Sequence, residues 1–233
     1  MNTNKKTARI AGFLYLSFIV FSAIANAVGR KGIIIDGDAA ATAANIIAQG
    51  TLFRVGFVSD LLSALLFLLT AWALYALLKQ VNRTLALLFL LLNLCGVAMQ
   101  CFSMILLYAA LPLASGGGYL AAFTTDQLNA QAMFFLGLYN AGFTSAQLFY
   151  GAWLFPLGYL VFKSGFLPRI LGIVLLVHCV GWLMTFLQSF LFPGFEAITY
   201  VSYPLGFIAE FGLTLWLLIM GAKEQKPASI EVG

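Results

Sequence analysis

The sequence contains very little charge: only 9% of its 233 residues are Asp, Glu, Lys or Arg. A soluble domain carries about a quarter charged residues, so this chain lacks the polar surface that water would require. It also lacks a basic stripe, because the net charge of +4 is spread over short loops. A nucleic-acid partner is therefore excluded, and the composition indicates a protein solvated by a lipid bilayer.

Missing residue types exclude several kinds of membrane chemistry. The single histidine, His178, cannot build a multi-histidine zinc site or supply both axial ligands of a haem. No lysine falls near the middle of an apolar run, so a retinal Schiff base has no attachment point. HExxH, Walker, GxGxxG and GxSxG motifs are absent. The three cysteines form no CxxC pair and are interpreted as packing residues. The sequence therefore implies no cofactor and no metal.

Long apolar runs are what the sequence does contain, and six of them reach the roughly 20 residues that a helix needs to cross a bilayer. This pattern predicts an all-α fold, a polytopic transmembrane bundle of six helices. We expect one domain over residues 1–222 and a short polar tail over 223–233, with six spans at 9–28, 52–78, 84–112, 134–162, 169–192 and 200–222.

The distribution of Lys and Arg predicts the orientation, because cytoplasmic loops are enriched in these residues. Both termini and the two short turns at 79–83 and 163–169 hold nine of the twelve cations, whereas the longer loops on the other side hold Arg30, Lys31 and Arg54. Both termini are therefore expected in the cytoplasm. The first span also resembles a cleavable signal, but its apolar run has the length of a span, so we expect it to stay uncleaved.

Two outer loops are expected to carry short amphipathic elements. Residues 38–49 are rich in Ala and begin with Asp38, a typical helix-capping residue, so they predict a helix on the membrane surface. Residues 125–132 are expected to form a second short element after the glycine-rich segment 115–118.

Three ionisable residues lie deep in the predicted spans, where a charge costs several kcal/mol. Asp60, His178 and Glu210 each lie about nine or ten residues into a span and are expected at one depth. We expect at least two of these side chains to lie within one water-bridged contact. An acid at this depth without a cationic neighbour is expected to be protonated, and Arg54 is expected to face outward or to meet a loop acid such as Glu196. The candidate ligand- or proton-binding residues are Asp60, His178, Glu210, Asn93, Gln100, Asn140 and Gln147.

Small and polar residues share one face of each predicted span, which marks the face turned away from lipid. Gly56 and Ser63 accompany Asp60, Gly181 and Thr185 accompany His178, and Gly206 and Thr214 accompany Glu210. Asn93 with Gln100, Asn140 with Gln147, and Tyr15 line the other spans. The bundle is therefore expected to have a polar interior.

Three segments carry a family resemblance: 36–41, 52–62 and 155–172, the last with the turn Lys163-Ser-Gly-Phe-Leu-Pro-Arg169. From about Arg9 to Gly221 the chain resembles bacterial membrane proteins called domain of unknown function 4386. The resemblance implies a multi-pass protein of the bacterial cytoplasmic membrane. It implies no activity and no catalytic residue.

Three hypotheses for function remain open. The first is a non-enzymatic bundle that binds or moves a small apolar or protonatable molecule at Asp60, His178 and Glu210. The second is a membrane-embedded enzyme that uses the same residues for acid–base chemistry. The third is a structural or regulatory subunit whose polar residues only join helices. The expected partners are the lipid bilayer and, under the first hypothesis, the small ligand.

Overall fold

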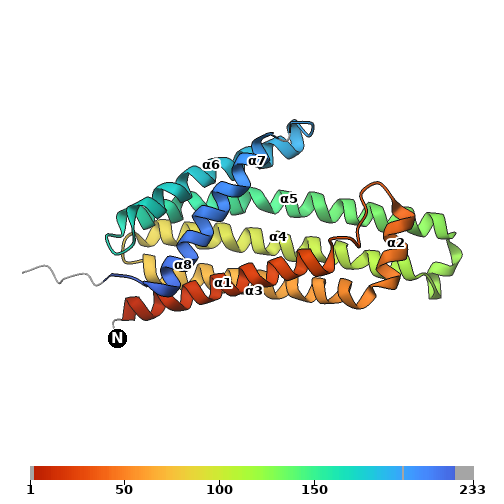
Figure 1. Ribbon diagram of the computed structural model, residues 1–233, viewed down its shortest axis with the longest axis horizontal. Coiled ribbons are helices and arrows are strands. Elements are labelled where there is room, and N and C mark those ends of the chain that lie inside the picture. Colours follow the sequence, from red (N-terminus) through yellow and green to blue (C-terminus); the bar gives the residue numbers. More distant parts are fainter. Residues whose placement is uncertain (1–2, 196, 224–233) are drawn as a thin grey trace, which may run out of the picture. The chain divides into compact units, whose positions relative to one another are not determined.

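A computed structural model describes residues 3–195 and 197–223 (Figure 1). Glu196 and most of the predicted tail, residues 224–233, lie outside the described residues. Over the described ranges every named element is a helix: α1 Thr3–Gly29, α2 Ala39–Ala48, α3 Gly50–Leu78, α4 Arg83–Ser115, the 3₁₀ turn Gly118–Ala122, α5 Thr125–Lys163, α6 Arg169–Leu191, α7 Ala197–Gly206, the π-helical turn Phe207–Phe211, and α8 Gly212–Ile219.

Five helical segments are long and apolar enough to cross a membrane: Asn4–Gly29, Gly50–Leu78, Arg83–Ser115, Arg169–Leu191 and Ser202–Ile219. They coincide with five of the six predicted spans. Large apolar side chains point outward from them; Phe13, Trp72, Ile105 and Ile170 are each more than 60% exposed. Such a surface is stable against lipid rather than water, so the protein is a multi-pass membrane protein.

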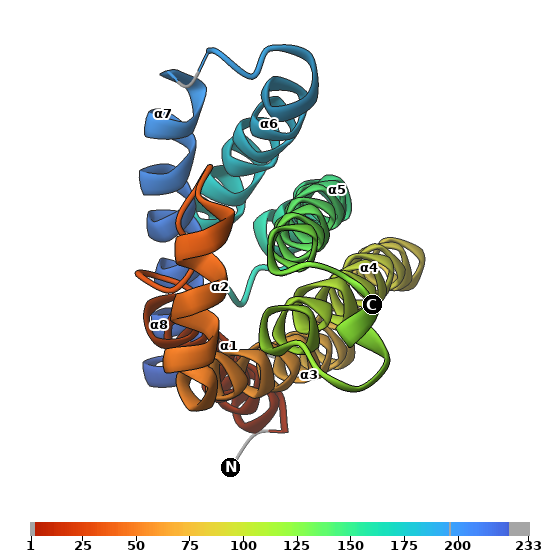
Figure 2. The ribbon, with the colours of Figure 1, turned by 90° about the vertical axis from the view of Figure 1, so that its right-hand side faces the viewer.

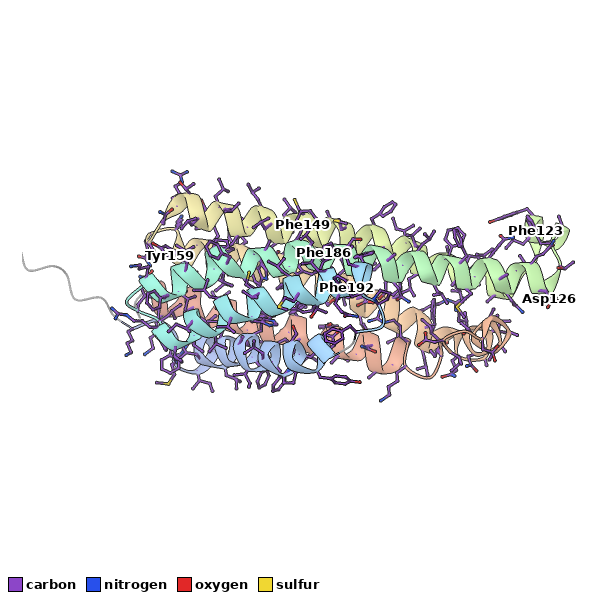
Figure 3. All side chains as sticks on the ribbon, turned by 90° about the horizontal axis from the view of Figure 1, so that it is seen from above. Phe123, Asp126, Phe149, Tyr159, Phe186 and Phe192 are labelled. Carbon is purple, nitrogen blue, oxygen red and sulfur yellow. The ribbon has the colours of Figure 1, made fainter. Side chains whose placement is uncertain are left out.

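Helix α5 differs from the prediction at its start. Residues 125–132 do not form a separate element but are the first two turns of α5, which runs for 39 residues. The helix begins with a reciprocal cap: the Thr124 hydroxyl accepts from the Gln127 backbone N–H at 3.3 Å, and the Gln127 side chain accepts from the Thr124 N–H at 3.0 Å. Figure 3 labels Phe123 and Asp126 at this turn. The cap fixes where the helix starts, and from there α5 continues without a break to Lys163.

Helix α2 forms where the alanine-rich segment predicted a surface helix. Asp38 caps it by accepting from the Ala41 N–H at 2.9 Å. Figure 2 shows α2 running crosswise to α3, which follows it directly. Ile46 is buried on one side of α2, while Ile47 is 58% exposed on another. This amphipathic pattern is typical of a helix at a membrane interface.

The described helices group into two compact units, and α1, α3, α4 and α5 contribute to both. The first unit contains residues 1–16, 69–93 and 150–233, and the second contains 17–68 and 94–149. The core of the second unit includes Ile33, Ile46, Phe53, Leu107 and Leu136, each at most 2% exposed. In the first unit Trp153 is fully buried and its ring packs edge-on against Phe89, at 6.2 Å between centroids.

Within the first unit, three hydrogen bonds join the ends of several helices. Arg9 donates to the Ile219 carbonyl at 3.2 Å, Asn4 donates to Gln80 at 3.4 Å, and the Lys223 N–H donates to the Phe166 carbonyl at 3.0 Å. The start of α1, the turn after α3, the turn after α5 and the end of α8 therefore lie together.

The turn between α5 and α6 has the geometry that its sequence predicts. Gly165 has a φ of +71°, which an L residue rarely adopts, and Pro168 directly precedes α6. The Ser164 hydroxyl accepts from the Leu167 N–H at 3.1 Å. Lys163 and Arg169 both lie over the ring of Phe162. The turn is thus held closed at its backbone while its two cations remain at the end of the helices.

The last predicted span is not a continuous α-helix. The π-helical turn Phe207–Phe211 separates α7 from α8. In the first unit α6 packs along α7 and this turn, as both ribbon views show (Figures 1 and 2). A π turn widens the helix locally, and such turns occur frequently at functional sites. Glu210 lies inside this one.

Candidate functional site

Glu210 receives two side-chain partners from two other helices. The Tyr15 hydroxyl of α1 donates to Glu210 Oε2 at 2.6 Å, and His178 Nε2 of α6 lies 3.1 Å from Oε1. The Tyr15 side chain is fully buried and that of His178 is 1% exposed, whereas that of Glu210 is 20% exposed. Each carboxylate oxygen therefore has one buried partner, and the carboxylate itself remains reachable. We call these three residues the glutamate site.

Gly206 makes room for the imidazole ring. A methyl group at Gly206 would overlap the His178 ring, with its Cε1 and Nε2 as the nearest atoms. Gly206 and Glu210 are four residues apart, so the glycine opens the helix face beside the glutamate. One turn along α6, Gly181 lies against the Ser202 side chain, where an added Cβ would come within 3.0 Å of its oxygen. Two glycines thus let α6 and α7 approach closely.

Two aromatic rings pack in series next to the imidazole. The Trp182 ring lies 5.7 Å from that of His178, and the Tyr203 ring lies 6.2 Å from Trp182. Figure 3 labels Phe186 and Phe192 further along α6 and just beyond its end. His178 Nδ1 is buried and has no hydrogen-bond partner in the described structure. The tautomer of the ring therefore depends on the contact between Nε2 and Glu210 alone.

The charge balance of the glutamate site is incomplete. Two ion pairs occur among the residues that the structure describes, and neither joins Glu210 to a lysine or arginine. With Glu210 ionised and His178 neutral, the site holds one negative charge inside a span. One proton, taken up by either residue, neutralises it. The arrangement can therefore hold a proton or exchange it for another cation.

Asp60 has a different partner. It lies in the second unit, where Arg30, one residue beyond the end of α1, forms an ion pair with it. The Tyr139 ring faces the same guanidinium, with Arg30 Cζ 5.8 Å from its centroid. The Asp60 side chain is 3% exposed and that of Arg30 17%. We call Arg30, Asp60 and Tyr139 the arginine cluster; its charge is already compensated.

Asp60 therefore has a cationic neighbour, and the condition under which it was expected to be protonated is not met. Arg30 stands next to the end of a span, so counting cations by side assigned it to a loop. Its guanidinium reaches Asp60 because Gly29 and Gly56 let α1 and α3 touch: a methyl group on either glycine would overlap the other's Cα. The two glycines are a sequence signal that another backbone approaches closely at these positions, although they do not show which helix it belongs to.

The other candidate site residues lie partly in the interior and partly at the surface. Asn93 and Gln100 of α4 are buried, at 0% and 4% exposure, as their helix face predicted. Both side-chain polar atoms of Asn93 are buried without a partner in the described part of the chain. On α5, Asn140 is exposed and Gln147 partly exposed. The prediction of an interior position is therefore wrong for Asn140, since the inward face of α5 at this level is occupied by Tyr139, which is 5% exposed.

Sequence reasoning placed Tyr15 on an inner helix face but not in the glutamate site. Tyrosine is common in apolar helices, and its position relative to Glu210 depends on how α1 packs. Gly12 allows that packing, because a Cβ there would overlap the backbone of Leu218 in α8. No group of three or more His, Cys, Asp or Glu that could hold a metal occurs within the described ranges.

Comparisons with known proteins give the family and no activity. The family described as Domain of unknown function (DUF4386) matches residues 10–221. An uncharacterised protein of Archaeoglobus fulgidus is 31% identical over 106 residues, which are 45% of this chain and 60% of that protein. This chain thus matches less than two thirds of the relative's length. No solved structure matches it significantly.

Proposed function

We propose a function for this chain from the premise that it belongs to the family Domain of unknown function (DUF4386): it binds a small protonatable molecule within the membrane, as a step in moving it, with Glu210 as the exchanging group. The description of the family names no activity, so the proposal depends on the glutamate site. The observation that carries it is that both oxygens of Glu210 have hydrogen-bond partners, but no lysine or arginine of the described ranges compensates its charge.

The contrast with Asp60 supports this assignment. Asp60 is paired with Arg30 and 3% exposed, so it has neither a free charge nor an open side. Glu210 has both, because it is 20% exposed and its neighbours can only donate hydrogen bonds or share a proton. A protonated amine or other organic cation can replace the proton at such a carboxylate, and the nearby rings of Trp182 and Tyr203 suit a cation or an apolar body.

We also propose that all six predicted spans cross the membrane, with both termini in the cytoplasm of a bacterial cell. The hydrogen bonds of Asn4, Arg9 and Lys223 support one common side for the start of α1, the turns after α3 and α5, and the end of α8. Most of the lysines and arginines of the chain lie in these segments, which favours the cytoplasm. Helix α5 is not among the five segments that are apolar enough to cross by composition, but with 39 residues it is long enough to be the remaining span.

The test is proton exchange by purified full-length protein in detergent. The lipophilic cation tetraphenylphosphonium, added at constant pH, should displace the proton held between Glu210 and His178 and bind to the carboxylate left ionised, which releases up to about one proton per chain. An infrared carboxyl band that titrates with pH should be present as well. Glu210→Gln should remain folded, because the amide keeps the shape and still accepts from Tyr15, but should lose both signals.

Two variants extend the test. His178→Gln should change the number of protons that tetraphenylphosphonium releases, since it removes one of the two groups that share the proton. Asp126→Asn, which removes an exposed acid at the start of α5, is the control and should leave both signals unchanged. Wild-type proton release and an unchanged band in Glu210→Gln would overturn the proposal. In that case the glutamate site would only join helices.

A further inference from the structure

A cavity at the junction of α2 and α3 lies outside both clusters described above. It has a volume of about 360 Å³ and lies entirely within the second unit. The junction itself forms most of its wall, and Leu111 and Ser115 at the end of α4 complete it. Ligand cavities start at about this size, so the space is large enough for a phosphate group with a short alcohol.

The cavity has a positive character. Arg54 lines it, and none of the described residues around it is acidic. The Arg54 side chain is exposed and forms no ion pair or hydrogen bond with any described residue. The guanidinium, with five donor N–H groups in a planar fork, matches the oxygens of a phosphate.

Further donors lie on the same wall. Gly50, Thr51 and Leu52 form the first turn of α3 and line the cavity. The first N–H groups of a helix have no carbonyl partner within it and carry a partial positive charge. The side chains of Gln49 and Thr51 add an amide and a hydroxyl. The Ser115 hydroxyl, by contrast, donates to the Leu111 carbonyl at 2.8 Å.

Apolar side chains continue outward from the same place. Ile47 is 58% exposed, and Leu52, Val55 and Val58 are each more than 40% exposed along the start of α3. Acyl chains pack against such a surface, while α2 crosses the helix end where headgroups lie. A charged cavity that opens beside an apolar helix face fits an amphiphile with an anionic head.

We propose that this cavity binds a phosphate group, held by Arg54 and the first turn of α3, and that the group belongs to an anionic phospholipid whose chains lie along α3. The free anion, inorganic phosphate, shares the recognised chemistry and is the other source. The inference is independent of the proposed function, because it concerns residues of the second unit that do not include Glu210, His178 or Tyr15.

The experiment counts lipids retained by the full-length protein in native mass spectrometry. Phosphatidylglycerol should bind in preference to phosphatidylcholine, and Arg54→Gln should weaken the phosphatidylglycerol complex about five-fold, the loss expected for one arginine at an anionic surface. Lys31→Gln is the matched control, since it removes an exposed cation outside the cavity. Equal weakening by Lys31→Gln, or wild-type binding by Arg54→Gln, would overturn the proposal.

A second variant tests whether weaker lipid binding could result from misfolding instead of the loss of the site. Thr51→Glu places a negative charge in the first turn of α3, where it favours the helix but repels a phosphate. It should match Arg54→Gln in lipid binding while its thermal stability stays at or above that of wild type. Wild-type phosphatidylglycerol binding by this variant would contradict the site.

Inorganic phosphate distinguishes the two sources. Stabilisation by phosphate beyond that of chloride at equal ionic strength, lost in Arg54→Gln, would assign the cavity to the free anion. Binding of phosphatidylglycerol without an effect of phosphate would assign it to the lipid. Binding of neither probe would overturn the proposal.

Discussion

The guanidinium of Arg30, one residue past the end of α1, forms an ion pair with the carboxylate of Asp60, ten residues into α3. Because of this pair, the two acids of the apolar helices, Asp60 and Glu210, have different surroundings. Asp60 is neutralised by Arg30, whereas Glu210 shares its carboxylate with a tyrosine and a histidine and has no lysine or arginine partner among the described residues. The first arrangement stabilises helix packing, and the second is the basis of the proposed exchange.

Asp60→Asn should therefore destabilise the protein. Removing one partner of a buried ion pair strands the other charge and costs about 3 kcal/mol or more. The Arg30 side chain is only 17% exposed, so water cannot fully replace the carboxylate. Unfolding in mixed detergent micelles measures the change. Combining Arg30→Met with Asp60→Leu should recover most of the loss, because no charge remains buried; stability as low as in Asp60→Asn would contradict the interpretation.

Gly206→Ala should disrupt the glutamate site without changing any polar group. The added methyl overlaps the His178 ring, which is buried and cannot move aside. Overpacking of this kind costs about 1–3 kcal/mol, so the thermal unfolding temperature in detergent should fall, and tetraphenylphosphonium should release fewer protons because His178 is displaced from Glu210. Gly212→Ala is the control, since its new methyl would meet only Leu171 Cδ2 at 3.6 Å. Equal effects of the two variants would refute the close packing of Gly206.

Gly56→Ala should weaken the ion pair of the arginine cluster, although Gly56 is not one of its residues. Gly56 and Gly29 touch through their Cα atoms, so a methyl group must separate α1 from α3 and lengthen the Arg30–Asp60 contact. The thermal unfolding temperature should fall, and Asp60→Asn should then cost less in this background, because the pair is already weakened. Gly50→Ala, where nothing lies within 4 Å of the added Cβ, should be neutral. Additive losses from Gly56→Ala and Asp60→Asn would argue against this coupling.

The orientation can be tested with reporters. A reporter that is active only outside the cytoplasm should be silent when fused after Lys223 and active when inserted at Gly117, which lies in the loop between α4 and α5. The basis is the bias of lysine and arginine towards the segments joined by Arg9, Asn4 and Lys223. Activity at the C-terminal fusion would overturn the arrangement with both termini inside.

Helical periodicity predicted which faces are buried. Ser63 and Asp60 of α3, Asn93 and Gln100 of α4, and His178 of α6 are all at most 4% exposed, because a small or polar stripe in an apolar helix avoids lipid. The contact between His178 and Glu210 also agrees with the expectation that at least two of the three ionisable residues lie together.

What the pattern could not give is the partner of each side chain. Arg30 reaches Asp60 only because two glycines on different helices meet, and a pairing between helices leaves no trace in the periodicity of either one. The merging of residues 125–132 into α5 could not be predicted either, because the cap between Thr124 and Gln127 begins a short amphipathic helix as readily as a long one. The prediction that Asn140 faces the interior was wrong because its neighbour Tyr139 is the buried residue at this level of α5.

The π-helical turn at Phe207–Phe211 has an evolutionary consequence. Each of its hydrogen bonds spans five residues instead of four, so the turn accommodates one residue more than a regular helix would. A relative in which that residue is deleted would keep an unbroken helix from α7 to α8, with Glu210 rotated away from His178. An alignment of the family should therefore contain members with a one-residue gap at this turn. Those members should also lack the glutamate or the histidine, and gapped members that retain both would show that the two residues do not depend on the turn.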